Sequence, residues 1–139
     1  MSTRSTLTVK SQTSKINFYR HMDGYVGGAG KDLYGVLYLI QTQQETNLLP
    51  SFIYGIANLK YKNNNRVYEF IDSPLLHADR EYHYTVTIIN NDINIRIEEF
   101  TLGKAIGKTF FDGNMEKFES YLIEEKIIWK KLVNNLLKD

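Results

Sequence analysis

Apolar and polar side chains alternate at residues 5–10 and again at residues 16–19. A period of two predicts two short strands, and the polar residues 11–14 between them predict a turn. Antiparallel pairing of these strands brings Arg4 and His21 to the same end of a hairpin.

From residue 31 the apolar period lengthens to that of a helix. The repeat i, i+3, i+4, i+7 predicts an amphipathic helix of about three turns, with a face made of Leu33, Val36, Leu37 and Ile40. A second helix is predicted from the cap residue Asn47 to Asn58 or Leu59, although Gly55 weakens its middle.

The period of two returns in the second half of the chain. Residues 66–71 predict a strand, and residues 82–88 and 93–100 predict a hairpin that turns at residues 90–92. Each hairpin strand has one apolar and one polar face, which is typical of a sheet covered on one side.

The C-terminal part predicts a loop over residues 101–113 and then a long helix to about residue 137, capped by Asp112 or Asn114. Its apolar stripe is interrupted at Glu125 and favours packing against the core. A weaker alternative is a seam between two copies of the chain, formed by Phe118, Leu122, Trp129 and Leu132.

Together these elements predict one α+β domain over residues 1–139. It contains an antiparallel sheet of four to five strands, with helices on one face and a long C-terminal helix.

Composition narrows the function classes. The 17 basic and 16 acidic residues leave a net charge of +1, which argues against a general nucleic-acid binder. The absence of cysteine fits a reducing compartment such as the cytosol, and no apolar stretch predicts a membrane span. Ten tyrosines suit half-buried strands and recognition surfaces alike.

A glycine-rich segment at residues 26–30 connects the first hairpin to the first helix. Its spacing does not match a phosphate-binding P-loop, because Tyr25 stands where the first glycine belongs and Asp32 where a hydroxyl should bind magnesium. Backbone N–H groups near Gly28 and Gly30 remain able to hold one anionic group at a helix start. The alternative is a plain turn.

The pattern His-x-Asp occurs twice, at His21 with Asp23 and at His77 with Asp79. Residues two apart on a strand point to the same side, so each pair is able to share one water or one metal ion. If both pairs met they would supply a metal site. The simpler interpretation is local hydrogen bonding, and we expect no cofactor.

Arg4 begins an apolar strand, where a guanidinium needs an anionic partner. Either it pairs with Asp23 and anchors the N-terminus, or it binds a ligand. In both cases Arg4, His21 and Asp23 are predicted to form one cluster, joined by Tyr19 and Tyr25.

The opening Ser2-Thr3-Arg4-Ser5 and residues 19–25 (Tyr-Arg-His-Met-Asp-Gly-Tyr) resemble a group of small phage and bacterial proteins. Those proteins carry a Tyr-x-His-Trp-Asp-Gly-Tyr-Pro segment; here Met22 replaces the tryptophan and Val26 the proline. The resemblance covers the first quarter of the chain and implies a phage or mobile-element context.

Three functions therefore remain open. The first is a non-catalytic binding protein, such as an inhibitor of a host defence system or enzyme, with a host protein as its partner. The second is a small hydrolase or phosphodiesterase that uses Arg4, His21 and Asp23. The third is capture of a small anionic, nucleotide-like ligand by the same residues. The chain is expected to be a monomer or a homodimer.

Overall fold

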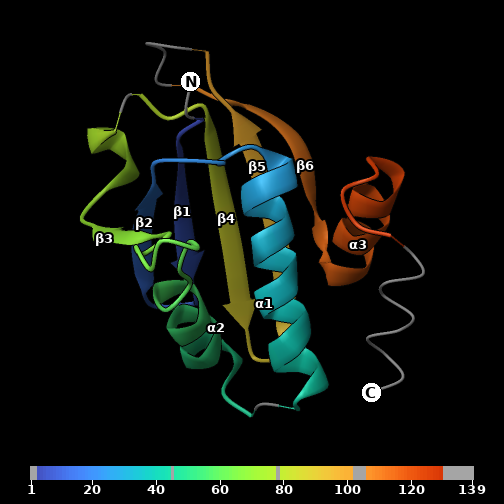
Figure 1. Cartoon of the computed structure of the whole chain (residues 1–139). Coiled ribbons are helices and arrows are strands. Elements are labelled where there is room, and N and C mark those ends of the chain that lie inside the picture. The colour runs from blue at the N-terminus through green and yellow to red at the C-terminus, as the bar shows by residue number, and fades with distance from the viewer. Residues whose placement is uncertain (1–2, 45, 78, 102–105, 130–139) are drawn as a thin grey trace.

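The computed structural model describes residues 3–44, 46–77, 79–101 and 106–129. Within these residues six strands form one sheet in the order β3-β2-β1-β4-β5-β6, accompanied by three α-helices (Figure 1). The elements are β1 (Ser5–Lys10), β2 (Lys15–Arg20), the π-helical turn η1 (Val26–Gly30), α1 (Lys31–Thr42), α2 (Leu48–Ala57), β3 (Glu69–Ile71), the 3₁₀ turn η2 (Pro74–Leu76), β4 (Tyr82–Ile89), β5 (Asp92–Glu99), β6 (Lys108–Asn114) and α3 (Met115–Glu124).

Two hairpins and one parallel pairing form the centre of the sheet. β1 pairs with β2 with Ser5 opposite Arg20, and β4 pairs with β5, as both predicted hairpins require. β1 also runs parallel to β4, with Thr6 beside His83, and this pairing joins the two hairpins. The predicted α+β class is confirmed, but the prediction of an antiparallel sheet is only partly right, because β1 and β4 are parallel and the other strand pairs are antiparallel.

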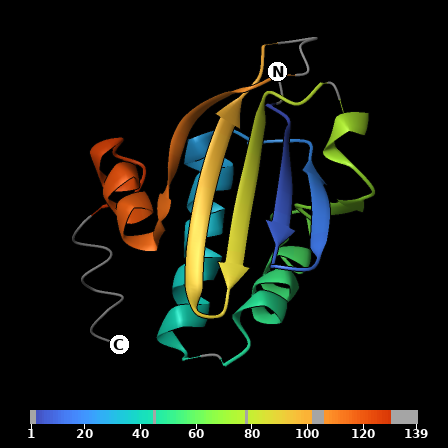
Figure 2. The same cartoon turned by 180° about the vertical axis from the view of Figure 1, so that it is seen from behind.

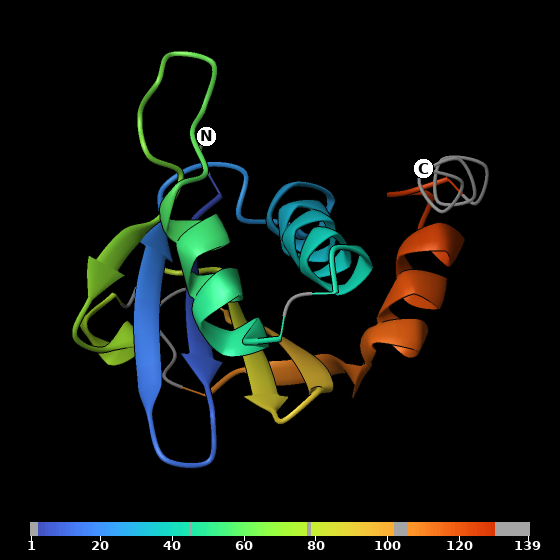
Figure 3. The same cartoon turned by 90° about the horizontal axis from the view of Figure 1, so that it is seen from below.

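All three α-helices lie on the same face of the sheet (Figures 1 and 3). Figure 2 looks onto the opposite face, where no α-helix of the described chain covers the central strands. The side chains alternate accordingly. The helix-covered face holds buried apolar residues such as Leu7, Val9, Phe18, Tyr84, Val86, Ile95 and Ile97. The uncovered face holds polar residues: Thr6, Thr8, Asn17, His83, Thr85 and Arg96.

The helices pack as their apolar stripes predict. Leu33 and Leu37 of α1 and Phe52 of α2 are completely buried in the core. Gly55 has a packing role, because a Cβ atom there would lie 2.6 Å from Cγ1 of Val36 on α1. None of the helices in the described ranges is long and apolar enough to cross a membrane.

One sequence prediction about the sheet is wrong, and another is only partly confirmed. The predicted loop at 101–113 contains the edge strand β6, and the strand predicted at 66–71 is reduced to β3. The sheet therefore has six strands within the described residues, instead of four or five. A β-bulge beside Ile97 lets two consecutive residues, Phe110 and Phe111, both contact Tyr121, so β6 lacks the alternation that reveals a strand.

The prediction of one long C-terminal helix also needs correction. Asn114 caps α3 by accepting a hydrogen bond from the N–H of residue 117, but the helix ends at Glu124 and Lys126 adopts a left-handed φ of 59°. Phe118 and Leu122 are 0% exposed in the core and cannot form a surface seam. Trp129 is exposed, and Leu132 lies outside the described residues.

Candidate ligand-binding site

A cleft of about 390 Å³ lies beside the glycine segment, where the chain from β2 to α1 meets the loop between α2 and β3. In Figure 3 this second loop projects beyond the helices, next to the chain that leads into α1. A hydrogen bond of 3.1 Å from the Tyr61 hydroxyl to the Met22 carbonyl joins the two segments. We call this space the glycine-loop cleft. Its lining consists of Arg20, Asp23, Tyr25, Gly27, Gly28, Lys31, Asp32, Leu59, Lys60, Tyr61, Lys62 and Val67.

Arg20 organises the inner wall of the cleft. It is only 3% exposed, and it donates hydrogen bonds of 2.7 Å to Asp32 Oδ2 and to the Met22 carbonyl. Its guanidinium also lies over the rings of Tyr61 and Tyr68, 5.9 Å and 5.4 Å from their centroids. Burial alone would lower the pKa of Arg20, but Tyr68 and Asp32 outweigh burial and raise it, so the side chain stays charged. Arg20 thus fixes both the approach to α1 and the facing loop.

The glycine segment is itself helical. η1 leads directly into α1, and Gly30 has ordinary helical angles, φ −62° and ψ −42°. Glycine is needed at residue 28 because a Cβ atom there would collide with the carbonyl oxygen of Asp23. Asp23 provides the sharp bend, with a left-handed φ of 58°.

Backbone donors are free at this helix start. Within the described chain, the N–H groups of Val26 and Gly27 have no hydrogen-bond partner, whereas those of Gly28 and Ala29 donate to the Tyr25 carbonyl. Two adjacent free N–H groups at a helix N-terminus favour a negatively charged ligand group.

The side chains around the opening carry excess positive charge. Lys31, Lys60 and Lys62 all line the cleft, and none forms an ion pair within the described residues. Because Arg20 and Asp32 neutralise each other, Asp23 is the remaining carboxylate against these three lysines. The local balance is therefore about +2 by this count.

Tyr25 and Tyr61 add aromatic surface to the same opening. Tyr25 is 46% exposed, and its ring lies against Gly27, 3.1 Å from the place a Cβ atom would take there. Tyr61 is held by its bond to Met22 and by Arg20 beside its ring. A flat ring of a ligand therefore has two aromatic surfaces beside the cationic groups.

The structure divides the residues that the sequence predicts as one cluster. Asp23, Tyr25 and Gly28 line the glycine-loop cleft, whereas Gly30 is buried at the end of η1. The predicted Arg4–Asp23 ion pair is wrong, because Arg4 Nε pairs with Asp79 Oδ2 at 3.2 Å.

Tyr19 and His21 lie with Arg4 on the other face of the sheet. The Tyr19 hydroxyl donates to the same Asp79 oxygen at 3.0 Å, and burial together with Asp79 raises the pKa of Tyr19 to about 12. The His21 ring packs edge-on against the Tyr19 ring, with 4.6 Å between the ring centroids, and the His77 ring lies tilted against the same tyrosine at 4.1 Å. Tyr19 thus contacts both histidine rings on the uncovered face of the sheet.

The two His-x-Asp pairs do not assemble a metal site. Among the described residues, no group of three or more histidine, aspartate or glutamate side chains is close enough to hold an ion. His21 is 4.0 Å from Glu69, and Asp23 belongs to the glycine-loop cleft. The weak metal prediction for His21, Asp23, His77 and Asp79 is therefore wrong.

The hydrolase hypothesis requires a nucleophile within reach of a base. In the part of the chain that the structure describes, the closest such pair is Thr6 with His83, whose Oγ1 and Nδ1 are 2.7 Å apart. Thr6 is completely buried, so a substrate cannot reach its hydroxyl. This pair is better explained as a structural hydrogen bond between β1 and β4.

Sequence reasoning missed Lys31, Lys60, Tyr61 and Lys62 as site residues. A signal was present in Lys60-Tyr61-Lys62, where two cations flank an aromatic residue. It could not be assigned to the glycine segment, because the contact between Tyr61 and Met22 joins residues 39 positions apart.

Comparison of this chain with family models, curated proteins and solved structures finds no match. Its function must therefore be inferred from the sites themselves.

Proposed function

We propose that this protein is a non-catalytic binding protein that captures a small phosphate-bearing, nucleotide-like ligand in the glycine-loop cleft. The observation that carries the proposal is the meeting of three lysines, two backbone N–H groups and two tyrosines at one opening, where the lysines and the N–H groups have no partner among the described residues. Such a combination suits a ligand with an anionic end and a flat ring.

Each part of the ligand has a group to meet it. Lysine ammonium groups and backbone N–H groups at a helix start both bind phosphate oxygens. Tyr25 and Tyr61 offer ring surface of the kind on which bases stack, worth about 1–3 kcal/mol per base in single-strand complexes. Asp23 would repel a phosphate placed beside it, so we expect a neutral part of the ligand to lie next to this carboxylate.

Calorimetric titration of the full chain with ADP, pyrophosphate and adenosine tests the proposal. We expect ADP to bind more tightly than either fragment, because only ADP engages both the cations and the rings. The affinity should fall as salt rises. If adenosine binds as well as ADP, the lysines do not contribute and the proposal fails.

A matched pair of double variants locates the site. Lys60→Ala with Lys62→Ala removes two cations from the cleft, and we expect at least a tenfold loss of ADP affinity. Lys10→Ala with Lys15→Ala removes the same charge from the paired ends of β1 and β2, outside the cleft lining, and should change the affinity little. Equal losses in both variants would mean that only net charge matters.

Recovery of the nucleotide separates the binding protein from the hydrolase alternative. After long incubation with a trace of protein, we expect the ADP to be unchanged by phosphorus NMR. Release of phosphate in excess of the protein would support the enzyme instead. The proposal includes the phage context and the action on a host target that the resemblance implies. A protein that acts by binding, and not by catalysis, is effective only in amounts comparable to its target.

A further inference from the structure

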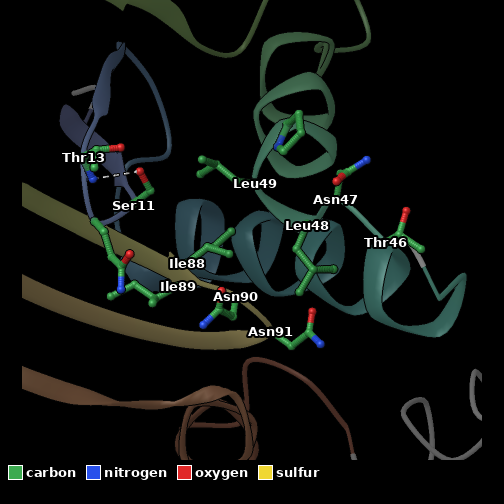
Figure 4. Close-up of a pocket in the computed structure, with 12 residues that line it drawn as sticks. Ser11, Thr13, Thr46, Asn47, Leu48, Leu49, Ile88, Ile89, Asn90 and Asn91 are labelled. Atoms are coloured by element: carbon green, nitrogen blue, oxygen red, sulfur yellow. Dashed lines mark hydrogen bonds between the residues drawn. The ribbon is translucent and has the colours of Figure 1, made fainter.

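A second hollow, of about 560 Å³, lies at the opposite end of the sheet from the glycine-loop cleft. It is bounded by the β1–β2 turn, the β4–β5 turn and the start of α2, and Figure 4 shows side chains of these three segments around one space. The two sites are at opposite ends because Ser11 follows β1, whereas Gly24 bonds to the chain before β1 at Thr3. We call this space the turn hollow.

Among the residues that the structure describes, the lining of the turn hollow contains no charged side chain. Its residues are Ser11, Gln12, Thr13, Thr46, Asn47, Leu48, Leu49, Pro50, Ile88, Ile89, Asn90 and Asn91. A charged ligand would lose hydration there and would meet no opposite charge among the described lining residues, so the lining favours a neutral ligand.

Polar and apolar groups are separated within the hollow. Leu48 and Ile88 are 7% and 3% exposed and form part of an apolar floor. The amides and hydroxyls of the two turns and of residues 46 and 47 surround this floor. A ligand with one apolar face and a polar perimeter matches this arrangement.

The amide side chains of the rim are free to bind. Within the described chain, Gln12, Asn47, Asn90 and Asn91 make no side-chain hydrogen bond. Asn47 stands at the cap position of α2 but does not cap it, and Pro50 in the third helical position has no N–H to offer. Each free amide both donates and accepts hydrogen bonds.

The walls that carry these amides are held in place without a ligand. The Ser11 hydroxyl accepts hydrogen bonds from the backbone N–H groups of Thr13 and Ser14, which fixes the β1–β2 turn. Asn90 adopts a left-handed φ of 57° in the tight β4–β5 turn. A pre-formed wall loses less entropy when a ligand binds.

From this combination we infer that the turn hollow binds a neutral polyhydroxyl ligand, namely a mono- or disaccharide. Sugar hydroxyls donate and accept in the same way as the free amides, and the C–H face of a sugar ring suits the apolar floor. The volume lies within the range of about 300–1,000 Å³ that is common for small-molecule sites. This site is separate from the glycine-loop cleft, and its test does not depend on the function proposed there.

Titration of the full chain followed by ¹⁵N–¹H NMR tests this inference, with methyl glucoside and maltose as neutral probes and methyl glucuronide as a charged probe that keeps the sugar ring. We expect saturable shifts for the neutral sugars, at residues 11–13, 46–49 and 88–91, with Kd of about 1 mM or below. Methyl glucuronide should bind at least fivefold more weakly than methyl glucoside. Absence of saturable shifts, shifts centred on another surface, or equal or stronger binding of methyl glucuronide would overturn the inference.

Three variants identify the groups responsible. Asn91→Ala and Asn47→Ala each remove one free amide, and each should weaken maltose binding at least fivefold. Two variants are used so that one remains informative if the other does not fold. Gln43→Ala removes an exposed amide outside the turn hollow and should bind as the wild type does. Wild-type affinity in both asparagine variants would refute the assignment.

Discussion

His83 should make the stability of this protein depend on pH in a way that one substitution removes. The positive charges of Arg80 and Arg96 act on the ring, Glu98 is opposite it on β5, and Thr6 is hydrogen-bonded to it from β1. Burial, and then the two arginines, lower the pKa of His83 from 6.5 to about 4. The folded protein therefore keeps the ring neutral at pH values where the unfolded chain protonates it.

The direction and size of the change in stability with pH follow from proton linkage. Between pH 6.5 and about 4 the unfolded state binds the proton and the folded state does not, so stability falls as the pH falls through this window. At about 1.4 kcal/mol per pH unit, the loss between pH 7.5 and pH 5 is about 2 kcal/mol. For a chain of this length that loss lowers Tm by about 7 °C.

Urea unfolding of the wild type and of His83→Asn at both pH values measures the effect. Asparagine retains a polar partner for Thr6 but does not titrate, and the other titrating groups are common to both proteins. We expect the wild type to lose about 2 kcal/mol more than the variant on acidification. An NMR titration of the His83 ring with a midpoint at pH 6 or above, or equal losses in both proteins, would refute this reasoning.

Three further predictions concern core packing, the geometry of the glycine-loop cleft, and its independence from the cluster of Arg4 and His21. Leu122→Ala should lower the free energy of unfolding by about 2–5 kcal/mol, because Leu122 is completely buried; a loss that varies with protein concentration would instead indicate an interface. Gly28→Ala should abolish ADP binding while most of the fold survives, because its Cβ displaces Asp23; unchanged calorimetry would contradict that geometry. The double variant Arg4→Ala with His21→Ala should keep ADP binding and cost about 1 kcal/mol or less, since the Arg4 pair is half exposed; a tenfold loss of ADP affinity would show that the two clusters act together.

The elements predicted well are those whose pattern depends on one buried face. β4 and β5 alternate along their whole length, because helices cover one side of the sheet and not the other. β6 escaped prediction because the bulge beside Ile97 places Phe110 and Phe111 against the same tyrosine. The end of α3 was overlooked although Glu125 interrupts the apolar stripe beside the turn that ends the helix.

The sites were harder to predict than the fold, because they depend on contacts between distant segments. Sequence reasoning recognised the glycine segment as a possible anion site but not the lysines that face it. The turn hollow was not predicted at all, since its turns are ordinary when read singly. Only the sheet brings residues 11–13 beside residues 88–91, through the parallel pairing of β1 with β4.

The polar motif at residues 19–25 illustrates why a compact sequence motif need not form one site. Alternation along β2 sends Tyr19 to the uncovered face, while Arg20 turns to the helix-covered face and binds Asp32. His21 follows Tyr19, and the bend at Asp23 carries the next residues over the other face, where Gly24 accepts a hydrogen bond of 2.6 Å from Tyr84. The two halves of the motif therefore lie on opposite faces of the sheet. One half fixes Arg4 and η2 on the uncovered face, and the other builds the glycine-loop cleft.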